Sequence, residues 1–130
     1  MRAVDTNVLA RYILDDDPIQ SPIARRVVRG GIFIPRTVLL ETAWLLRSRY
    51  QFERADIVHA LSTLLDMPDV FVTAEAEIRW SIERFEAGAD FADMLHLLES
   101  ARQSSFATFD QDIAARAGPD SPIPVELLTA

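Results

Sequence analysis

The chain has 130 residues, of which 49% are hydrophobic, and a formal net charge of −7. This length suits one compact domain with a real core, so we expect a single domain over residues 1–130. The chain has no cysteine, which excludes disulfides and thiolate chemistry. No signal peptide or membrane-length apolar run is evident, so the cytoplasm is the expected compartment, with no membrane association.

The first half of the chain alternates short apolar runs with helical periodicity. Residues 3–5 predict a strand, and residues 7–14 predict a helix for which Thr6 is a suitable N-cap. The acidic run 15–17, followed by Pro18, ends this helix and is expected to be a solvated loop rather than a metal site. The next predicted elements are a helix over 19–29, a strand over 32–34, a helix over 37–50 and a helix over 54–65.

The second half continues the alternation. Its predicted elements are a strand over 70–72, helices over 74–86 and 91–102, a strand over 106–108, a helix over 111–117 and an edge strand over 122–127. Strands that alternate with helices are typical of parallel α/β packing. We therefore expect a three-layer α/β fold, in which helices flank a central parallel sheet of about four to five short strands.

Four carboxylates fall at predicted strand ends or in the first turns of helices. Asp5 ends the first predicted strand, Asp110 follows a later one, and Glu41 and Asp93 lie early in apolar helices. The carboxyl ends of parallel strands meet at one sheet edge, where ligands bind. Carboxylate oxygens gathered there would suit Mg²⁺ or Mn²⁺, ions that activate water and stabilise charge on a phosphoryl group. The pattern indicates metal-dependent phosphodiester chemistry.

Each of these acidic residues also has an ordinary structural explanation. Asp5 and Asp90 are suitable helix caps, and Glu41 alone could be a surface residue of its helix. Of Asp110 and Asp112, one is expected to be only a cap, because an acidic residue at a helix start is favoured by the helix dipole. We favour Asp110 as the functional member of that pair.

The histidines and tryptophans are expected to be structural. His96 lies one turn from Asp93, but a lone helical histidine is more often structural than a general base, and His59 is expected on a helix surface. Trp44 and Trp80 are expected to be core or packing aromatics rather than platforms for nucleobases.

Together, these motifs resemble those of PIN-domain ribonucleases over essentially the whole chain. The resemblance is carried by Asp5-Thr6-Asn7-Val8-Leu9, by Glu41, by Asp93 within FADMLHLL and by Thr108-Phe109-Asp110. A single domain of this size most resembles VapC, the toxin of bacterial type II toxin–antitoxin pairs. The resemblance implies a parallel α/β fold and a Mg²⁺- or Mn²⁺-dependent endoribonuclease. It also implies an RNA substrate, a homodimer and a cognate VapB-like antitoxin.

The resemblance also assigns roles to individual residues. The implied metal ligands and catalytic residues are Asp5, Glu41, Asp93 and Asp110, with Asp90 and Asp112 as further candidates. Thr6, Asn7 and Thr108 would orient carboxylates through hydrogen bonds. Tyr12, Ile13, Trp44 and Leu45 are candidates for an apolar groove that receives an antitoxin helix.

Two other classes of function share parts of this pattern. A phosphoacceptor signalling domain also holds Mg²⁺ at a parallel sheet edge, but that class uses a lysine, and all thirteen basic residues here are arginine. The same absence excludes a P-loop and Schiff-base chemistry on lysine. A catalytically silent PIN-fold interaction module is the other alternative, and it predicts no stabilisation by divalent ions.

Overall fold

Five short strands form two parallel sheets within residues 1–129, the part of the chain that this computed structural model describes. The strands and helices belong to two compact units. The first unit extends from Met1 to Glu75 and holds three strands, and the second begins at Ala76 and holds two. The α/β class and the parallel pairing predicted from the sequence are therefore confirmed.

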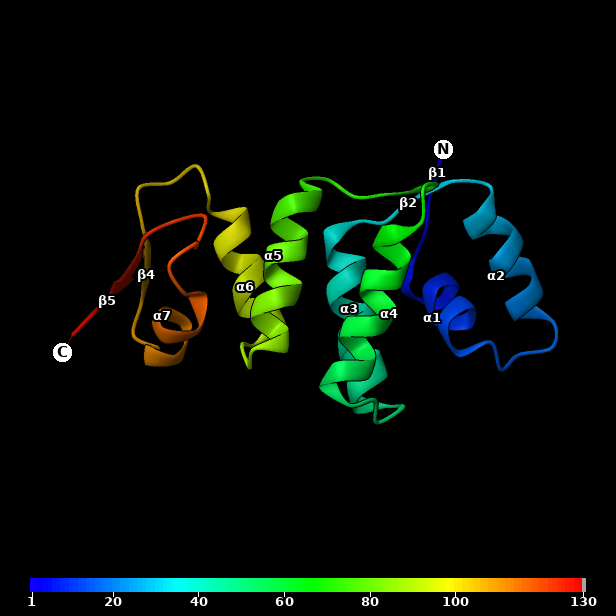
Figure 1. The fold of residues 1–130 in the computed structure, drawn as a ribbon, viewed down its shortest axis with the longest axis horizontal. Helices are drawn as coiled ribbons and strands as arrows, with labels where there is room; N and C mark the ends of the chain where they lie inside the picture. The colour runs from blue at the N-terminus through cyan, green and yellow to red at the C-terminus, as the bar shows by residue number, and fades with distance from the viewer. Residues whose placement is uncertain (130) are drawn as a thin grey trace. The chain divides into compact units, whose positions relative to one another are not determined.

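The sheet of the first unit has the order β1-β2-β3. Its strands are β1 (Arg2–Ala3), β2 (Ile32–Phe33) and β3 (Val70–Phe71), and its helices are α1 (Thr6–Leu14), α2 (Gln20–Arg29), α3 (Arg36–Ser48) and α4 (Arg54–Asp66). Helix α1 packs against both α2 and α3, and α3 also packs against α4 (Figure 1). This packing places the start of α1 next to the first turns of α3.

Apolar residues at helical spacing form the core of the first unit. Helix α4 buries Ile57, Leu61 and Leu64 along one face, which is the period expected for an amphipathic helix. The fully buried large side chains of this unit are Leu9, Ile32, Ile34, Leu39, Leu46, Ile57, Leu61 and Leu64. A capping box formed by Glu53 and Asp56 fixes the start of α4.

The second unit pairs β4 with β5 in parallel. Its elements are α5 (Glu75–Glu86), α6 (Phe91–Glu99), β4 (Phe106–Thr108), α7 (Gln111–Ala117) and β5 (Val125–Leu127). The first residue of α5, Glu75, is the last residue of the first unit. Its core cluster consists of Ala89, Met94, Leu97, Ile113, Ala117 and Ile123, with Trp80, Phe106 and Val125 packed against it. Within this part of the chain, α6 therefore shares a core with α7.

Glycine is required at two turns by the backbone conformation. Gly31, in the break predicted between α2 and β2, has a φ of 92°, which is favourable for glycine but strained for other residues. Gly88 has a φ of 117°, and a Cβ placed there would lie 2.8 Å from Nη1 of Arg116. The Arg116 side chain reaches this turn to donate a hydrogen bond to the Ala87 carbonyl at 3.1 Å.

Most predicted elements are present, but two details of the prediction, the cap of α1 and the end of α6, were wrong. The N-cap of α1 is Asp5 and not Thr6, which is the first helical residue. Helix α6 stops at Glu99, and the backbone N–H of Ser100 caps it by bonding to the carbonyl of His96. The five strands agree with the four to five expected: β1, β2 and β3 pair within the first unit, and β4 pairs with β5 within the second.

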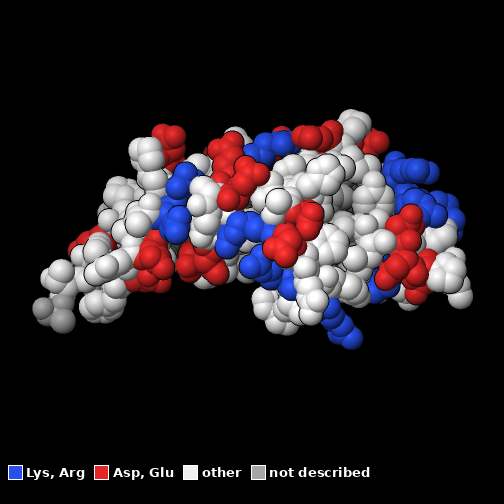
Figure 2. Space-filling view, turned by 60° about the horizontal axis from the view of Figure 1, so that its bottom comes forward, with Lys and Arg blue, Asp and Glu red and all other residues white. Residues whose placement is uncertain are grey.

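The surface of α2 is rich in arginine. Arg25, Arg26 and Arg29 lie on this helix, and Arg26 and Arg29 are exposed. Figure 2 shows basic side chains gathered over α2, at the right of the view. None of the helices in residues 1–129 combines the length and the apolar character that crossing a bilayer requires.

Candidate functional site

The first acidic pair lies where β1 leads into α1 and one turn into α3. Oδ1 of Asp5 accepts a hydrogen bond from the backbone N–H of Val8 at 3.1 Å, which caps α1. The buried Thr6 donates its hydroxyl to Oε1 of Glu41. This bond ties α1 to α3 and holds one oxygen of the Glu41 carboxylate. Asp5 keeps its second oxygen, which no hydrogen bond uses within residues 1–129.

Asp5 and Glu41 line the same hollow, which has a volume of about 480 Å³. Both residues are exposed. Exposure lowers the free-energy cost of the two charges and leaves them accessible to a cation. Asn7 also lines this hollow, but its side chain has no hydrogen-bond partner among the residues described, and its predicted orienting role stays a prediction.

Trp44 also lines the hollow, and the structure contradicts its predicted place in the core. The residue is 66% exposed. Helix α3 instead turns Leu39, Thr42, Ala43 and Leu46 inward. Trp80, by contrast, is partly buried and packs against the core of the second unit, as expected.

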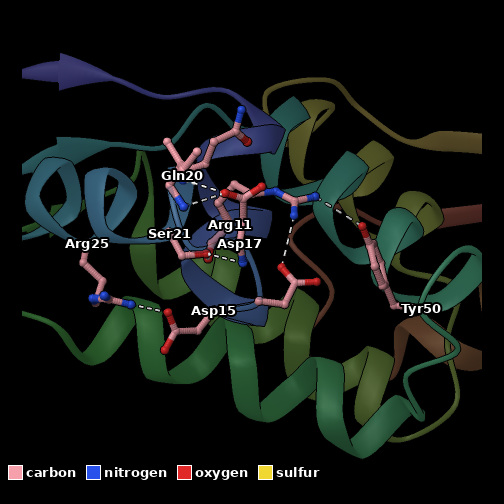
Figure 3. Close-up of polar contacts among 9 residues, drawn as sticks. Arg11, Asp15, Asp17, Gln20, Ser21, Arg25 and Tyr50 are labelled. Carbon is pink, nitrogen blue, oxygen red and sulfur yellow. Dashed lines mark hydrogen bonds and ion pairs between the residues drawn. The ribbon is translucent and has the colours of Figure 1, made fainter.

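Arg11 links the hollow to the acidic loop that follows α1. Nη1 of Arg11 pairs with Asp16 at 3.1 Å, and Nη2 donates a hydrogen bond to the Tyr50 hydroxyl at 3.3 Å (Figure 3). The Arg11 side chain is only 20% exposed. Arg11 and Tyr50 therefore form a fixed polar wall of the hollow.

The carboxylates of the acidic loop contact other groups of the first unit. Asp15 pairs with Arg25, and Asp17 accepts hydrogen bonds from the backbone N–H groups of Gln20 and Ile19 at 2.7 and 2.9 Å (Figure 3). These backbone bonds lower the pKa of Asp17, because they stabilise its charged form. With Asp16 held by Arg11, each carboxylate of the loop has a partner within the protein.

The second acidic group is built around the start of α6. Asp90 caps this helix, and its Oδ1 accepts the backbone N–H of Asp93 at 3.0 Å. Burial raises the pKa of the half-buried Asp93, and the carboxylates of Asp90 and Asp110 raise it further, while His96 opposes them. The Asp93 carboxylate is therefore in a crowded acidic environment that a cation would relieve.

Asp110 occupies the equivalent capping position at α7. Its Oδ1 accepts the backbone N–H of Asp112 at 2.8 Å. The hydroxyl of Thr108 accepts the backbone N–H of Asp110 at 3.0 Å, so Thr108 orients the main chain of Asp110 and not its carboxylate. The cap of this pair is Asp110, the residue we favoured as the functional member, and Asp112 lies exposed in the first turn.

The four predicted ligands occur as two pairs, one in each unit. Asp5 lies with Glu41, and the charge of Asp110 acts on Asp93. Residues 1–129 contain no group of three or more His, Asp or Glu side chains arranged to hold a metal ion. Mg²⁺ commonly uses only one or two carboxylates, together with waters and substrate phosphates. Each pair fits that requirement, and the quartet as one ligand set stays a prediction.

The four residues expected to form an antitoxin groove lie in two separate hollows. Tyr12 and Ile13 line a hollow of about 540 Å³ with the exposed His59 of α4. Trp44 and Leu45 line the hollow that holds Asp5 and Glu41 instead.

Sequence reasoning did not identify Arg49 and Tyr50 as residues of the candidate site. Arg49 caps the end of α3 through its backbone, and both residues line the hollow of the first acidic pair. Helical spacing carried a signal for Trp44, because residues three apart share a helix face and Trp44 is three residues from Glu41.

The comparisons with known proteins give one match. The family model described as PIN domain matches residues 2–119. None of the curated proteins and none of the solved structures matched the chain.

Proposed function

The chain belongs to the PIN domain family, whose members are generally nucleases, and we propose that it is a metal-dependent endoribonuclease. One observation supports this best: Asp5 and Glu41 line one accessible hollow, and Thr6 orients Glu41. Oxygen donors of this kind suit Mg²⁺ or Mn²⁺. We further propose that residues 1–130 act as one PIN domain, since the family match extends across both units.

The proposed ligands are Asp5, Glu41, Asp93 and Asp110, with Asp90 and Asp112 as additional acidic groups. When bound, Mg²⁺ or Mn²⁺ would lower the pKa of water and stabilise charge on the phosphoryl group. The protein orients the carboxylates. Capping bonds fix one oxygen each of Asp5 and Asp110, and the Thr6 hydroxyl fixes one oxygen of Glu41.

Removing divalent ions should abolish cleavage. We expect the purified protein to cut total RNA into discrete fragments with Mg²⁺ or Mn²⁺ and to leave it intact with EDTA. Mapping the fragment ends would identify the bond that is cut. Cleavage that continues at full rate in EDTA would contradict the metal-dependent mechanism.

A thermal melt separates the nuclease from a silent interaction module. Binding to the native state stabilises a protein, by roughly 2.7 kcal/mol when the free ligand is 100 times its Kd. We therefore expect Mn²⁺ to raise the melting temperature. An unchanged melting temperature at millimolar Mn²⁺, together with no cleavage, would favour the silent module.

The hydroxyl of Thr6 should matter for cleavage through Glu41. Thr6→Val keeps the shape of this buried side chain but removes the bond to Glu41. Losing a group that orients a metal ligand typically costs about 10- to 100-fold in activity, and we expect a loss of that size in the cleavage rate.

Thr6→Ser is the matched control, because it keeps the hydroxyl and should retain most of the rate. Equal losses in Thr6→Val and Thr6→Ser would show that the methyl packing matters and not the bond to Glu41.

The biological role that we propose is that of a VapC-like toxin in the cytoplasm. Its partners would be a second copy of the chain and a small VapB-like antitoxin. The hollow beside α4 is lined by apolar residues such as Ile13, Phe52 and Leu64 and by polar ones such as Asp56 and His59, and it supports a site for an antitoxin segment with one apolar face. An antitoxin arginine would also complement the acidic pair Asp5 and Glu41.

Co-expression tests this role. The protein alone should arrest growth, and the product of a small neighbouring reading frame should relieve the arrest and co-purify with the protein. Growth that continues normally with the active protein would contradict the toxin role while leaving the nuclease proposal in place.

A further inference from the structure

Trp44 carries a large aromatic side chain that lies on the protein surface. It is 66% exposed, although α3 has an inward face on which it could be buried. A single exposed hydrophobic residue is common on protein surfaces and needs no explanation by itself. Trp44, however, shares a hollow with Asp5 and Glu41, so its indole lies beside the proposed reaction site.

The geometry of α3 fixes this relation between the tryptophan and the acidic pair. Glu41 and Trp44 are three residues apart in one helix, which places both side chains on the same face. The Thr6 hydroxyl binds Glu41 and therefore holds this face of α3 against the start of α1. The indole and the two carboxylates consequently belong to one wall and not to separate surfaces.

The same hollow contains two arginines in different states. Arg11 is engaged by Asp16 and Tyr50 and acts as part of the wall. The exposed side chain of Arg49 makes no ion pair and no hydrogen bond within residues 1–129. A free guanidinium suits a phosphate oxygen, which it can bind through two N–H groups.

An exposed aromatic ring and a free arginine that line one hollow form a combination that suits single-stranded nucleic acids. Bases stack on the ring while the backbone phosphates lie against the positive charge. Duplex bases are already stacked on each other and cannot reach such a ring. Resting on the proposed nuclease function, we propose that Trp44 stacks an unpaired RNA base while Arg49 holds an adjacent phosphate, which positions the strand at Asp5 and Glu41.

RNA binding without cleavage tests this directly. The probe is a single-stranded RNA of about 12 nucleotides, titrated in EDTA. Trp44→Ala should weaken binding about 10-fold, since stacking on an aromatic side chain contributes that much or more per base. Trp44→Phe keeps an aromatic ring, so its RNA affinity should lie between those of Trp44→Ala and the wild type. An affinity of Trp44→Ala equal to that of the wild type would overturn the proposal.

Fluorescence reports the contact itself. Trp80→Phe leaves Trp44 as the only tryptophan and removes an indole N–H that is buried without a hydrogen-bond partner in the described part of the chain. Single-stranded RNA should quench this variant, and duplex RNA of the same sequence should not. Equal quenching by both forms would contradict base stacking.

Abasic substitutions separate stacking from general attraction. Removing one base from the RNA should weaken binding to the wild type but leave binding to Trp44→Ala unchanged. If Trp44→Ala instead alters the mass in light scattering and leaves RNA affinity intact, Trp44 belongs to a protein interface and the proposal fails. If the wild type cleaves RNA but Trp44→Ala binds RNA as tightly as the wild type, this inference alone fails. If RNA binding depends on Trp44 but no cleavage occurs, only the nuclease proposal fails.

Discussion

Replacing Asp5 by asparagine should reduce metal-dependent RNA cleavage about 1,000-fold. A catalytic metal ion stabilises a phosphoryl transition state by several kcal/mol, and each 1.4 kcal/mol is a factor of 10 in rate. The substitution removes the charge but keeps the shape of the side chain. Asparagine caps helices as well as aspartate does, so the bond from the Val8 N–H and the start of α1 should survive.

Two further variants make the Asp5 result specific. Asp69→Asn removes an exposed carboxylate of the same unit that does not line the hollow, and this variant should cleave RNA at the wild-type rate. Asp5→Ala should lose the cap as well as the charge, lowering stability by about 1 kcal/mol relative to Asp5→Asn. Cleavage by a folded Asp5→Asn protein at a rate near that of the wild type would contradict the assignment.

Replacing Asp93 by asparagine should change activity and stability in opposite directions. Cleavage should fall about as far as in Asp5→Asn, because a proposed ligand is lost. Stability without metal should rise. Because the folded pKa of Asp93 lies above its ordinary value of 3.8, its charged form is disfavoured in the native state, mainly by burial and then by Asp90.

The pH dependence follows from the sign of this pKa shift. The neutral carboxyl of Asp93 is best accommodated below about pH 4, and that part of the stability is lost as the pH rises through the raised pKa. In EDTA at pH 7, we expect Asp93→Asn to melt about 1–4 °C above the wild type. Mn²⁺ should stabilise the wild type more than the variant.

Asp120→Asn is the control for the Asp93 result, since it removes an exposed carboxylate from the same unit. It should change neither the cleavage rate nor the response to Mn²⁺. A lower melting temperature for Asp93→Asn in EDTA would show that the Asp93 carboxylate has a structural role and would remove the argument for a crowded site.

Local sequence patterns predicted individual elements well. The strand over 106–108 and the helix over 111–117 have the predicted bounds, because Asp110 and Gly118 mark the two ends of α7. The cap of α1 was misplaced by one residue, since Asp5 and Thr6 are both good capping residues. The Thr6 hydroxyl bonds to Glu41 and is therefore not used as the helix cap. This bond joins residues 35 positions apart, so the local sequence gives no signal for it.

The place of Trp44 in α3 was predicted wrongly for a related reason. Trp44 was expected to be a core or packing residue, but the inward face of α3 includes Thr42 instead. Thr42 tolerates burial because its hydroxyl donates to the carbonyl of Val38 at 2.7 Å. A polar residue whose hydroxyl is satisfied within its own helix can therefore replace an apolar one in the core, and composition alone does not reveal this.

Long-range pairing was the least predictable part. Parallel pairing was predicted correctly, but strands of two or three residues carry too little pattern to specify which strands are neighbours. The acidic residues were found because each stands at a strand end or helix start. Trp44 and Arg49 were not assigned to the site, because their role depends on which side of α3 meets α1.

The most direct test of the central claim is the chemistry of the cut ends. A defined single-stranded RNA should be incubated with Mn²⁺ and either the wild-type protein or Asp5→Asn, and the fragments analysed by mass. Attack by water predicts linear phosphate ends from the wild type and no fragments from Asp5→Asn. Cyclic phosphate ends, which form when the RNA 2′-hydroxyl attacks, or equal fragments from both proteins, would contradict metal-dependent hydrolysis at Asp5.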